Sequence, residues 1–261
     1  MVEVKKLIKS FDDNIVLKDI STVFEAGITN LIIGRSGSGK TVLMKNLIGL
    51  MQPDSGEILY SGRNIIAMGK KELKLLRQEM GMLFQGSALF DSMTVLENVI
   101  FPLTMFTKNP YKERYKRAMF CLERVNLKEA EHLYPAEISG GMMKRAGIAR
   151  AIALNPKYLF CDEPNSGLDP KTSLLIDDLI SDITKEYKIT TVINTHDMNS
   201  VMNIGEKIIF INKGKKAWEG NKDQIMHAEN KALNDFVFAS DLFKKVREVE
   251  NSLESEAEAD D

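Results

Sequence analysis

The sequence predicts an α/β fold with a mainly parallel β-sheet. Three short apolar runs are typical of buried strands, at residues 30–33, 157–163 and 189–194. The last of these runs is rich in β-branched residues, as parallel strands are. The first two are each followed by a turn and then by a segment with helical spacing. With 261 residues, the chain can form one large α/β domain or two subdomains that share a core.

The stretch at residues 34–41 reads GRSGSGKT, follows the first of these strands and matches the G-x-x-x-x-G-K-[ST] phosphate-binding pattern. Glycines let successive backbone N–H groups point at an anion, and the helix that starts near Lys40 adds its positive dipole end. Lys40 is placed to reach the β- and γ-phosphates of a nucleotide, and Thr41 to offer its hydroxyl to Mg²⁺. The alternative interpretation is a flexible Gly/Ser turn. The predicted phosphate loop consists of Gly34, Arg35, Ser36, Gly37, Ser38, Gly39, Lys40 and Thr41.

A second helix start carries glycines, within residues 135–156, which read PAEISGGMMKRAGIARAIALNP. Ser139, Gly140 and Gly141 precede a helical run at residues 142–154, so the backbone at this helix end can also approach an anion. One chain needs only one phosphate loop for each nucleotide. We therefore expect this helix end to bind a nucleotide that is shared between two chains.

Polar residues follow the second and third strands. The strand at residues 157–163 ends in Asp162 and Glu163. Asp162 is the sort of carboxylate that holds Mg²⁺ from the second shell, and Glu163 can polarise an attacking water. His196 comes directly after the third strand and could hydrogen-bond a γ-phosphate. A solvated strand end is the alternative for the two acids, and a structural role is the alternative for His196.

Two further residues have weaker signals. Gln85 ends a short apolar strand at residues 81–85, where its amide could reach a metal or a water; a polar strand end is the alternative. Phe11 stands just before a turn at residues 12–14 and could stack on a nucleotide base, which contributes about 1–3 kcal/mol. A half-buried turn aromatic is the alternative for Phe11.

The remaining elements follow from shorter patterns. Thr94 and Glu97 form a capping-box pair within the helical run at residues 91–105. The run at residues 111–125 is basic and amphipathic, so it is either a solvated helix face or a membrane-surface helix. Other predicted strands are residues 2–10, 15–24, 57–60, 208–211 and 215–220, and other predicted helices are residues 70–78, 171–186 and those after 223.

Composition indicates a protein without nucleic acid as a partner, because the formal net charge is only −2. The last residues, 248–261, contain seven Asp and Glu residues and no Lys or Arg, which predicts a disordered acidic tail. Cys121 and Cys161 have no metal-ligand partners nearby in sequence. No signal peptide opens the chain and no apolar run approaches the ~18–20 residues of a membrane span. We therefore expect a cytoplasmic protein that would act on a membrane only through a partner.

In this order, the motifs resemble those of the ATP-binding cassette (ABC) ATPase subunits of membrane transporters. The resemblance covers about residues 1–225 and implies a P-loop NTPase fold of the ABC ATPase type. That fold has a RecA-like core, an antiparallel β subdomain and an α-helical subdomain, here expected near residues 86–155. We expect a C-terminal helical extension at residues 226–247, before the acidic tail.

The resemblance implies a role for each motif. Gln85 corresponds to the glutamine loop, residues 138–142 (ISGGM) to the signature, residues 166–169 (SGLD) to the D-loop, and His196 to the switch histidine. Phe11 then looks like the adenine-stacking aromatic. Asp169 of the D-loop is counted among the nucleotide contacts.

The family mechanism would place two ATP molecules between two copies of the chain. Each ATP would contact the phosphate loop of one copy and residues 139–141 of the other. Mg²⁺ would be held by Thr41 and Gln85, with Asp162 behind. Glu163 would act on the attacking water, and His196 would contact the γ-phosphate.

A narrower resemblance concerns the sequence FQGSALFDSMTVLENVIFPL and the signature ISGGM. These look like the ATPases of Mla-type systems, the MCE-associated ABC transporters that move phospholipids between bacterial membranes. The usual ABC signature ends in Gln, whereas Met142 stands here, which puts the side-chain amide contact to the ribose in doubt. The resemblance implies an integral membrane permease, an MCE-type substrate-binding protein and phospholipid cargo, with the chain bound peripherally at the cytoplasmic face of the inner membrane.

Other classes of function are weighed against this one. An ABC importer for a small polar solute would have the same catalytic motifs, so it is the serious alternative. An ABC ATPase of DNA repair would need a long coiled coil between the phosphate loop and the signature, and the sequence has none. In the C-terminal extension, Phe236, Phe238, Leu242 and Phe243 form an apolar stripe that would reach either the partner copy or the chain's own core.

Overall fold

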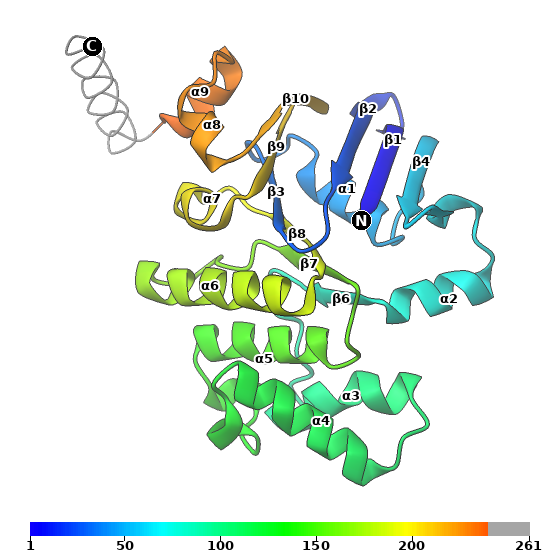
Figure 1. Ribbon diagram of the computed structural model, residues 1–261, viewed down its shortest axis with the longest axis vertical. Coiled ribbons are helices and arrows are strands. Elements are labelled where there is room, and N and C mark those ends of the chain that lie inside the picture. Colours follow the sequence, from blue (N-terminus) through cyan, green and yellow to red (C-terminus); the bar gives the residue numbers. More distant parts are fainter. Residues whose placement is uncertain (240–261) are drawn as a thin grey trace.

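Two β-sheets lie on either side of helix α1 (Lys40–Leu47) in the computed structural model, which describes residues 1–239 (Figure 1). The smaller sheet is antiparallel, with the strand order β2-β1-β4-β5. The larger sheet has the order β10-β9-β3-β8-β7-β6. The strands of the smaller sheet are β1 (Val2–Phe11), β2 (Asn14–Phe24), β4 (Ser55–Tyr60) and β5 (Arg63–Asn64). Those of the larger sheet are β3 (Thr29–Ile33), β6 (Met80–Leu83), β7 (Tyr158–Asp162), β8 (Thr190–Asn194), β9 (Lys207–Asn212) and β10 (Lys215–Gly220).

The larger sheet is parallel from β9 to β6, and only β10 runs antiparallel, beside β9. This confirms the expected parallel sheet. Strand β3 lies between β9 and β8, and β7 lies next to β8. Because parallel strands point the same way, the segments that follow β3, β7 and β8 all leave from one edge of the sheet. In open α/β sheets this edge is where ligands bind.

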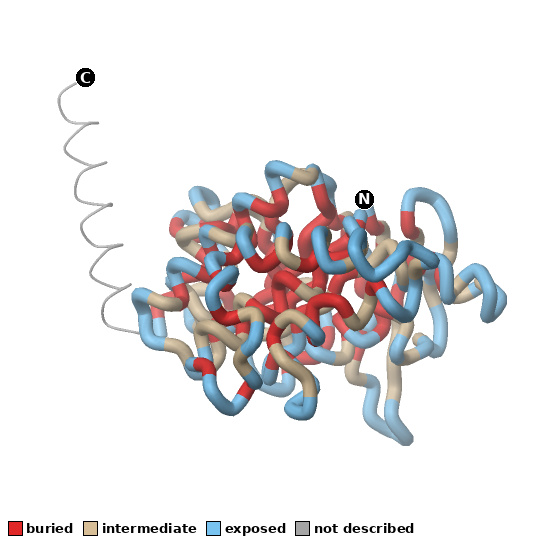
Figure 2. The backbone as a smooth tube through the Cα atoms, turned by 90° about the horizontal axis from the view of Figure 1, so that it is seen from below, coloured by how far each residue is buried: buried red, intermediate tan, exposed pale blue. Residues whose placement is uncertain are grey.

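Alternating side chains of the larger sheet enter two separate cores. In β3, Leu31 and Ile33 belong to the core under α5 (Gly140–Ile152) and α6 (Pro170–Tyr187), whereas Ile32 belongs to the core around α1. The same alternation places Cys161 of β7 in the first core and Phe160 in the second. Successive strand residues point to opposite faces, so a sheet covered on both faces must be apolar throughout. This explains why β3 and β7 are mostly apolar; buried residues gather in the red centre of the molecule in Figure 2.

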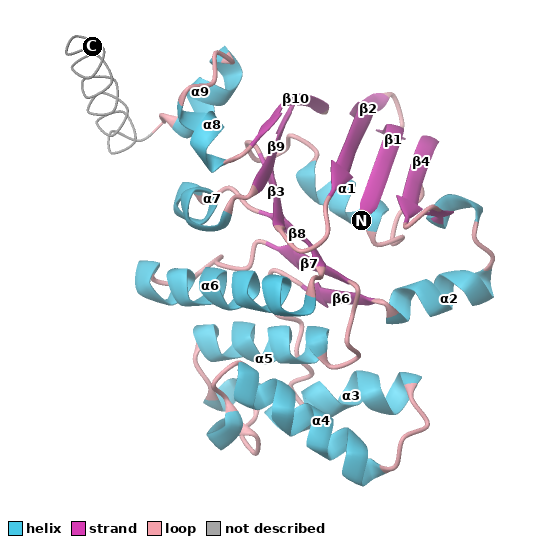
Figure 3. Cartoon of the chain, in the orientation of Figure 1, coloured by secondary structure: helices cyan, strands magenta, loops and turns pink. Residues whose placement is uncertain are grey.

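The other helices cover the sheet and form a layer beyond it. Helices α3, α4 and α5 lie together at the end of the molecule away from the smaller sheet (Figure 3). Helix α3 begins later than expected, at Val95, because Thr94 caps it in the predicted capping box with Glu97. The helices are α2 (Lys70–Gln78), α3 (Val95–Phe106), α4 (Tyr111–Arg124), α5 (Gly140–Ile152), α6 (Pro170–Tyr187), α7 (Met198–Ile204), α8 (Lys222–Met226) and α9 (Lys231–Val237). Three short 3-10 turns, Ile65–Ala67, Lys128–Ala130 and Pro135–Glu137, complete the described elements.

The described part of the C-terminal extension packs on the chain's own core. Phe238 is buried there, and the ring of Phe236 lies 5.6 Å from that of Phe210 on β9. Leu242, Phe243 and the acidic residues 248–261 lie outside the described residues. Among residues 1–239, no helix combines the length and the apolar character needed to cross a membrane.

Candidate functional site

A cleft of about 1120 Å³ opens where the chain leaves β3, β7 and β8. Three sequence segments that are far apart in the chain meet here, together with residues that follow β6 and residues of α9. The predicted site residues that line the cleft are Arg35, Ser36, Gly37, Gly39, Lys40, Thr41, Gln85, Glu163 and His196. The fold therefore brings together the groups that the sequence suggested separately.

Two glycines of the loop after β3 are required by its backbone. Gly34 has φ +149°, and a Cβ there would lie 2.3 Å from the carbonyl oxygen of Ile211. Gly39 has φ +109°, and a Cβ there would lie 2.9 Å from a methyl group of Leu17. Side chains rarely adopt such φ values, and real Cβ atoms do not approach other atoms so closely. The loop can therefore hold this shape against β9 and β2 only with glycine at both positions.

The side chain of Lys40 is folded back into the loop. It is 7% exposed, and its Nζ donates to the carbonyl oxygens of Gly34, at 2.8 Å, and Arg35, at 3.3 Å. Burial lowers the pKa of Lys40, and the charges of Glu163 and Asp162 partly oppose this effect. The ammonium group thus lies at the mouth of a backbone loop. An anion that enters the loop would form charge-assisted hydrogen bonds with a cation that is largely shielded from water.

The two acids at the end of β7 have different surroundings. Asp162 accepts a hydrogen bond from the side-chain amide of Asn194 at the end of β8. Glu163 has φ +49°, a left-handed conformation that is uncommon for residues other than glycine. Its N–H donates to the carbonyl oxygen of Asn194 at 2.8 Å, which holds the turn against β8. Such strained positions cluster at functional sites.

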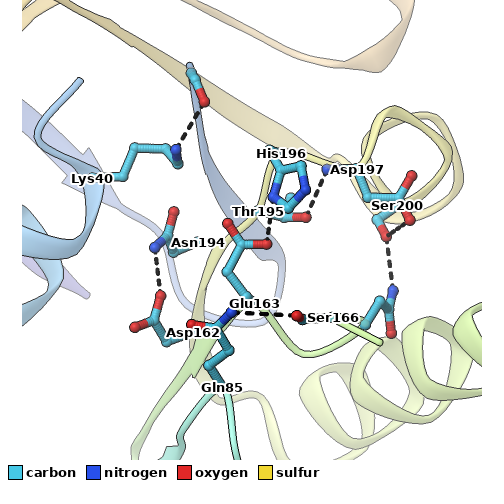
Figure 4. A network of polar contacts seen from close by, with 12 residues as sticks. Lys40, Gln85, Asp162, Glu163, Ser166, Asn194, Thr195, His196, Asp197 and Ser200 are labelled. Atoms are coloured by element: carbon cyan, nitrogen blue, oxygen red, sulfur yellow. Dashed lines mark hydrogen bonds and ion pairs between the residues drawn. The ribbon is translucent and has the colours of Figure 1, made fainter. Parts of the chain in front are cut away.

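Figure 4 shows the side chains of Glu163 and His196 pointing toward each other. Oε2 of Glu163 lies 2.8 Å from Nδ1 of His196, while the Glu163 side chain is 15% exposed and that of His196 66%. In the same view, Gln85 and His196 lie on opposite sides of Glu163. The Nε2 of Gln85 donates to Oγ of Ser166 at 3.3 Å. A carboxylate, an imidazole and an amide therefore surround the space in front of Lys40.

One face of α5 holds the segment that carries Gln85, and the motif interpretation had not included this contact. Nζ of Lys144, which is buried, donates to the carbonyl oxygens of Gln85 and, at 3.3 Å, of Glu163. Two turns further on, the guanidinium of Arg150 donates to the carbonyl oxygens of Ser87, at 2.6 Å, and Ala88, at 2.7 Å. Helix α5 thus fixes the backbone of this segment at three carbonyl groups.

The glycine-containing start of α5 lies outside the cleft. Ser139, Gly140, Gly141 and Asp169 line a separate hollow of about 400 Å³. Ser139 caps α5 by accepting from the N–H of Met142 at 3.3 Å. Asp169 caps α6, and the hydrogen bonds that it accepts from Thr172 lower its pKa. Within one copy, these residues therefore do not meet the phosphate loop.

Phe11 does not line the cleft. It lies at the end of β1, it is 43% exposed, and Lys9 Nζ lies 5.6 Å from its ring. Val16 of β2 does line the cleft, and so do residues of α9, which sequence patterns did not suggest. The guanidinium group of Arg35 donates a hydrogen bond to the backbone carbonyl oxygen of Asp235 at 3.3 Å. Helix α9 therefore forms a wall of the cleft beside the phosphate loop.

Comparison with known proteins agrees with this arrangement. A family model described as "ABC transporter" matches residues 17–166, which is more than half of the chain. The chain belongs to the ABC transporter family. The expected fold and the expected ABC ATPase domain are therefore confirmed.

Relatives within the ABC family carry different transport names. The "Probable ribonucleotide transport ATP-binding protein mkl" of Mycobacterium leprae is 38% identical over 236 residues, which are 90% of this chain and 68% of that protein. The "Methionine import ATP-binding protein MetN" of Bartonella henselae is 39% identical over 228 residues, which are 86% and 66% of the two chains. The "Intermembrane phospholipid transport system ATP-binding protein MlaF" of Haemophilus influenzae is 35% identical over 237 residues, which are 91% of this chain and 90% of that protein. The chain thus spans about two thirds of the length of mkl and MetN.

A solved ABC structure has the same fold. The dimeric structure of MJ0796, described as a bacterial ABC transporter cassette, aligns with a TM-score of 0.78 at 31% identity and covers 85% of this chain and 99% of that one. Another structure of the same cassette is a post-hydrolysis state with ADP and Pi bound. The ABC ATPase fold of this chain is therefore established both by sequence and by structure.

The donors around the cleft suit a nucleotide phosphate chain with Mg²⁺. Mg²⁺ keeps several waters and is usually held by one or two protein ligands together with substrate phosphates. Thr41, which is exposed, and Gln85 line the cleft and offer a hydroxyl and an amide oxygen, while the carboxylate of Asp162 at the end of β7 is outside that lining; together they are such a sparse oxygen set. Among the described residues, Ser38 Oγ is buried beside Gly34 without a hydrogen-bond partner, so the loop has polar capacity left for an anion.

Proposed function

We propose that this chain is the ATP-binding and ATP-hydrolysing subunit of a membrane transporter, and that it works as a homodimer. The observation that carries this proposal is the meeting of Lys40, Glu163 and His196 in one cleft. A buried cation can hold a phosphate chain, a carboxylate beside it can orient and deprotonate a water, and an imidazole can hydrogen-bond the transferred phosphate. A binding module without turnover would not need the carboxylate.

The proposed roles follow from position. Lys40 and the loop N–H groups hold the phosphates of ATP. Thr41, Gln85 and Asp162 would hold Mg²⁺, which would neutralise charge on the phosphates. Glu163 accepts a proton from the attacking water, because it lies at the cleft with an oxygen bonded to His196. His196 contacts the γ-phosphate. Phe11, which stands at the end of β1, stacks on the adenine.

A second copy completes the site in this proposal. The residues at the start of α5, Ser139 to Gly141, line a hollow separate from the cleft of the same copy, and Asp169 lies beside them. A head-to-tail dimer would bring this hollow of one copy onto the phosphates bound by the other. The dimeric MJ0796 cassette, which has the same fold, supports this arrangement.

For the transported substrate we propose phospholipid, moved by an Mla-type system. The MlaF relative and Met142 in the signature support this assignment. The proposed partners are an integral permease and an MCE-type substrate-binding protein, at the cytoplasmic face of the inner membrane. In domain terms, residues 1–225 form the ATPase domain with its helical part at 86–155, residues 226–247 the extension and residues 248–261 the tail. The alternative is an importer of a small polar solute, which the name of the MetN relative supports, while the mkl relative is named for ribonucleotide transport.

Replacement of the proposed base tests the ATPase function. Glu163→Gln is expected to lower ATP turnover by roughly 10²–10⁴-fold, the contribution of a positioned base, while ATP affinity changes little. Turnover is measured as phosphate release by the chain assembled with its membrane partner. Glu129→Gln is the matched control, because Glu129 is an exposed glutamate in a 3-10 turn outside the cleft. Turnover by Glu163→Gln close to that of Glu129→Gln would refute the role of Glu163.

The substrate requires a separate experiment. The chain is purified in mild detergent from its host, and the co-purifying proteins and lipids are identified by mass spectrometry. An MCE-domain protein with a permease and phospholipid would support the Mla-type assignment. A periplasmic solute-binding protein would instead establish the importer and leave the ATPase mechanism unchanged.

A further inference from the structure

A buried polar cluster joins three elements behind the cleft. Asn165 lies in the turn two residues after Glu163, and its side chain is 8% exposed. Its Nδ2 donates to Oδ1 of Asp177 on α6 and to Oγ of Ser200 on α7, each at 2.8 Å. The turn after β7 is thus tied by one amide both to α6 and to α7.

Asp177 is the acceptor at the centre of this cluster. It is 1% exposed, and burial raises its pKa to about 6, although hydrogen bonds from Ser200 and Asn165 oppose the rise. The ionisable groups around it are Asp178 on its own helix, Asp197 at the start of α7 and Cys161 on β7. A carboxylate without a cation among these neighbours is costly to bury. An apolar side chain would avoid that cost, so packing alone does not explain an acid here.

The cluster joins the two chain segments that carry Glu163 and His196, the residues that contact each other in the cleft. Glu163 precedes Asn165 in the turn after β7, and His196 precedes Asp197, which caps α7 by accepting from the N–H of Asn199 at 2.9 Å. Figure 4 shows Ser200 beside Asp197, and its Oγ donates to Oδ2 of Asp197 at 3.5 Å. The hydrogen bond between Asn165 and Ser200 therefore also holds the backbone of Glu163 in place relative to that of His196.

We propose that Asp177 is a positioning residue for ATP hydrolysis, which through Asn165 and Ser200 holds Glu163 and His196 at hydrogen-bond distance. This inference rests on the proposed ATPase function. A carboxylate accepts from both donors, whereas an amide or a protonated carboxyl group offers one acceptor fewer. Losing one of the two bonds frees the turn or α7, and a displacement near 1 Å at a reacting group costs up to about 10²-fold in rate.

The first test compares Asp177→Asn with Asp178→Asn in the full chain assembled with its membrane partner. Both variants remove one negative charge from α6, but Asp178 is exposed and bonded only to Asn203 among the described contacts. At about pH 7.5, Asp177→Asn is expected to lower kcat by roughly 10–100-fold while the KM for ATP stays within about twofold. As the pH falls through 6, the wild type should approach the Asp177→Asn variant, because its carboxyl group becomes protonated. Asp178→Asn should keep the wild-type kcat at about pH 7.5 and move the transition only slightly to lower pH, because Asp178 makes the smallest of the charge contributions that raise the pKa of Asp177.

A second measurement does not depend on turnover. The ring ¹⁵N chemical shifts of His196, assigned with His196→Ala, should change in Asp177→Asn and in Ser200→Ala but not in Asp178→Asn. Circular dichroism and thermal unfolding verify that each variant is folded. Wild-type kcat and unchanged His196 shifts in Asp177→Asn would overturn the inference. A wild-type complex without ATP turnover would refute the proposed function instead, and the His196 shifts would still decide the role of Asp177.

Discussion

Replacing Asp177 with asparagine also makes a prediction about stability that needs no catalytic assumption. Burial raises the pKa of Asp177 from 3.8 to about 6. The folded state therefore holds this proton more tightly than the unfolded chain, so the wild type loses stability as the pH rises between those two values. One pKa unit corresponds to about 1.4 kcal/mol. Ionisation of Asp177 should thus cost the folded protein about 3 kcal/mol at neutral pH, a cost that Asp177→Asn does not have.

Urea unfolding at about pH 4 and about pH 7.5 measures this effect as a difference between two proteins. Between these conditions, the unfolding free energy of Asp177→Asn should gain about 2–3 kcal/mol relative to that of the wild type. The change with pH is the informative quantity, because lost or new hydrogen bonds of the variant contribute equally at both pH values. Asp178→Asn should stay within about 0.5 kcal/mol of the wild-type pH dependence, as surface substitutions usually do. Parallel pH dependences for Asp177→Asn and the wild type would refute the reasoning.

Three further substitutions test the site and the fold. Lys40→Ala should raise the Kd for ATP roughly 10–100-fold in calorimetric titration, because a charged hydrogen bond to phosphate contributes about 1.5–3 kcal/mol; an unchanged Kd would show that the loop amides suffice. Gly34→Ala should abolish ATP binding and lower the melting temperature, since its Cβ would lie 2.3 Å from the carbonyl oxygen of Ile211; a variant that binds ATP normally would contradict the required backbone. Thr94→Ala should lower the unfolding free energy by about 1 kcal/mol in urea, because the hydroxyl caps α3; no loss would mean that Glu97 alone secures the helix start.

The parts of the site that could be predicted from sequence depend on local patterns. The phosphate loop is recognised because its glycines, Lys40 and Thr41 must stand at set positions between a strand and a helix. Glu163 and His196 are recognisable because each follows an apolar run that is long enough for a buried strand. The parallel sheet then brings the two together, which explains why separate motifs met in one cleft.

The parts that could not be predicted depend on packing between elements. Lys144 reads as one cation in a basic segment, and only the packing of α5 on the segment after β6 brings it to the backbone of Gln85. Val16 enters the cleft because β2 passes beside the phosphate loop. Asp177 did leave a signal, since it occupies the buried face of α6 together with Ile176 and Ile180. An acid at an apolar position of a helical pattern is the kind of exception that indicates a buried polar cluster.

The contacts of α5 have a mechanical consequence. The helix has 13 residues and is therefore about 20 Å long. Its first turn is the proposed contact to a nucleotide on the other copy, while Lys144 and Arg150 grip the segment of Gln85 further along. A helix that binds a ligand at its first turn and is hydrogen-bonded to a neighbouring segment along its length is expected to shift or tilt as one body. In the proposed dimer, nucleotide bound to one copy would thus act on α5 of the other copy, and through α5 on the backbone of Gln85, the proposed Mg²⁺ ligand.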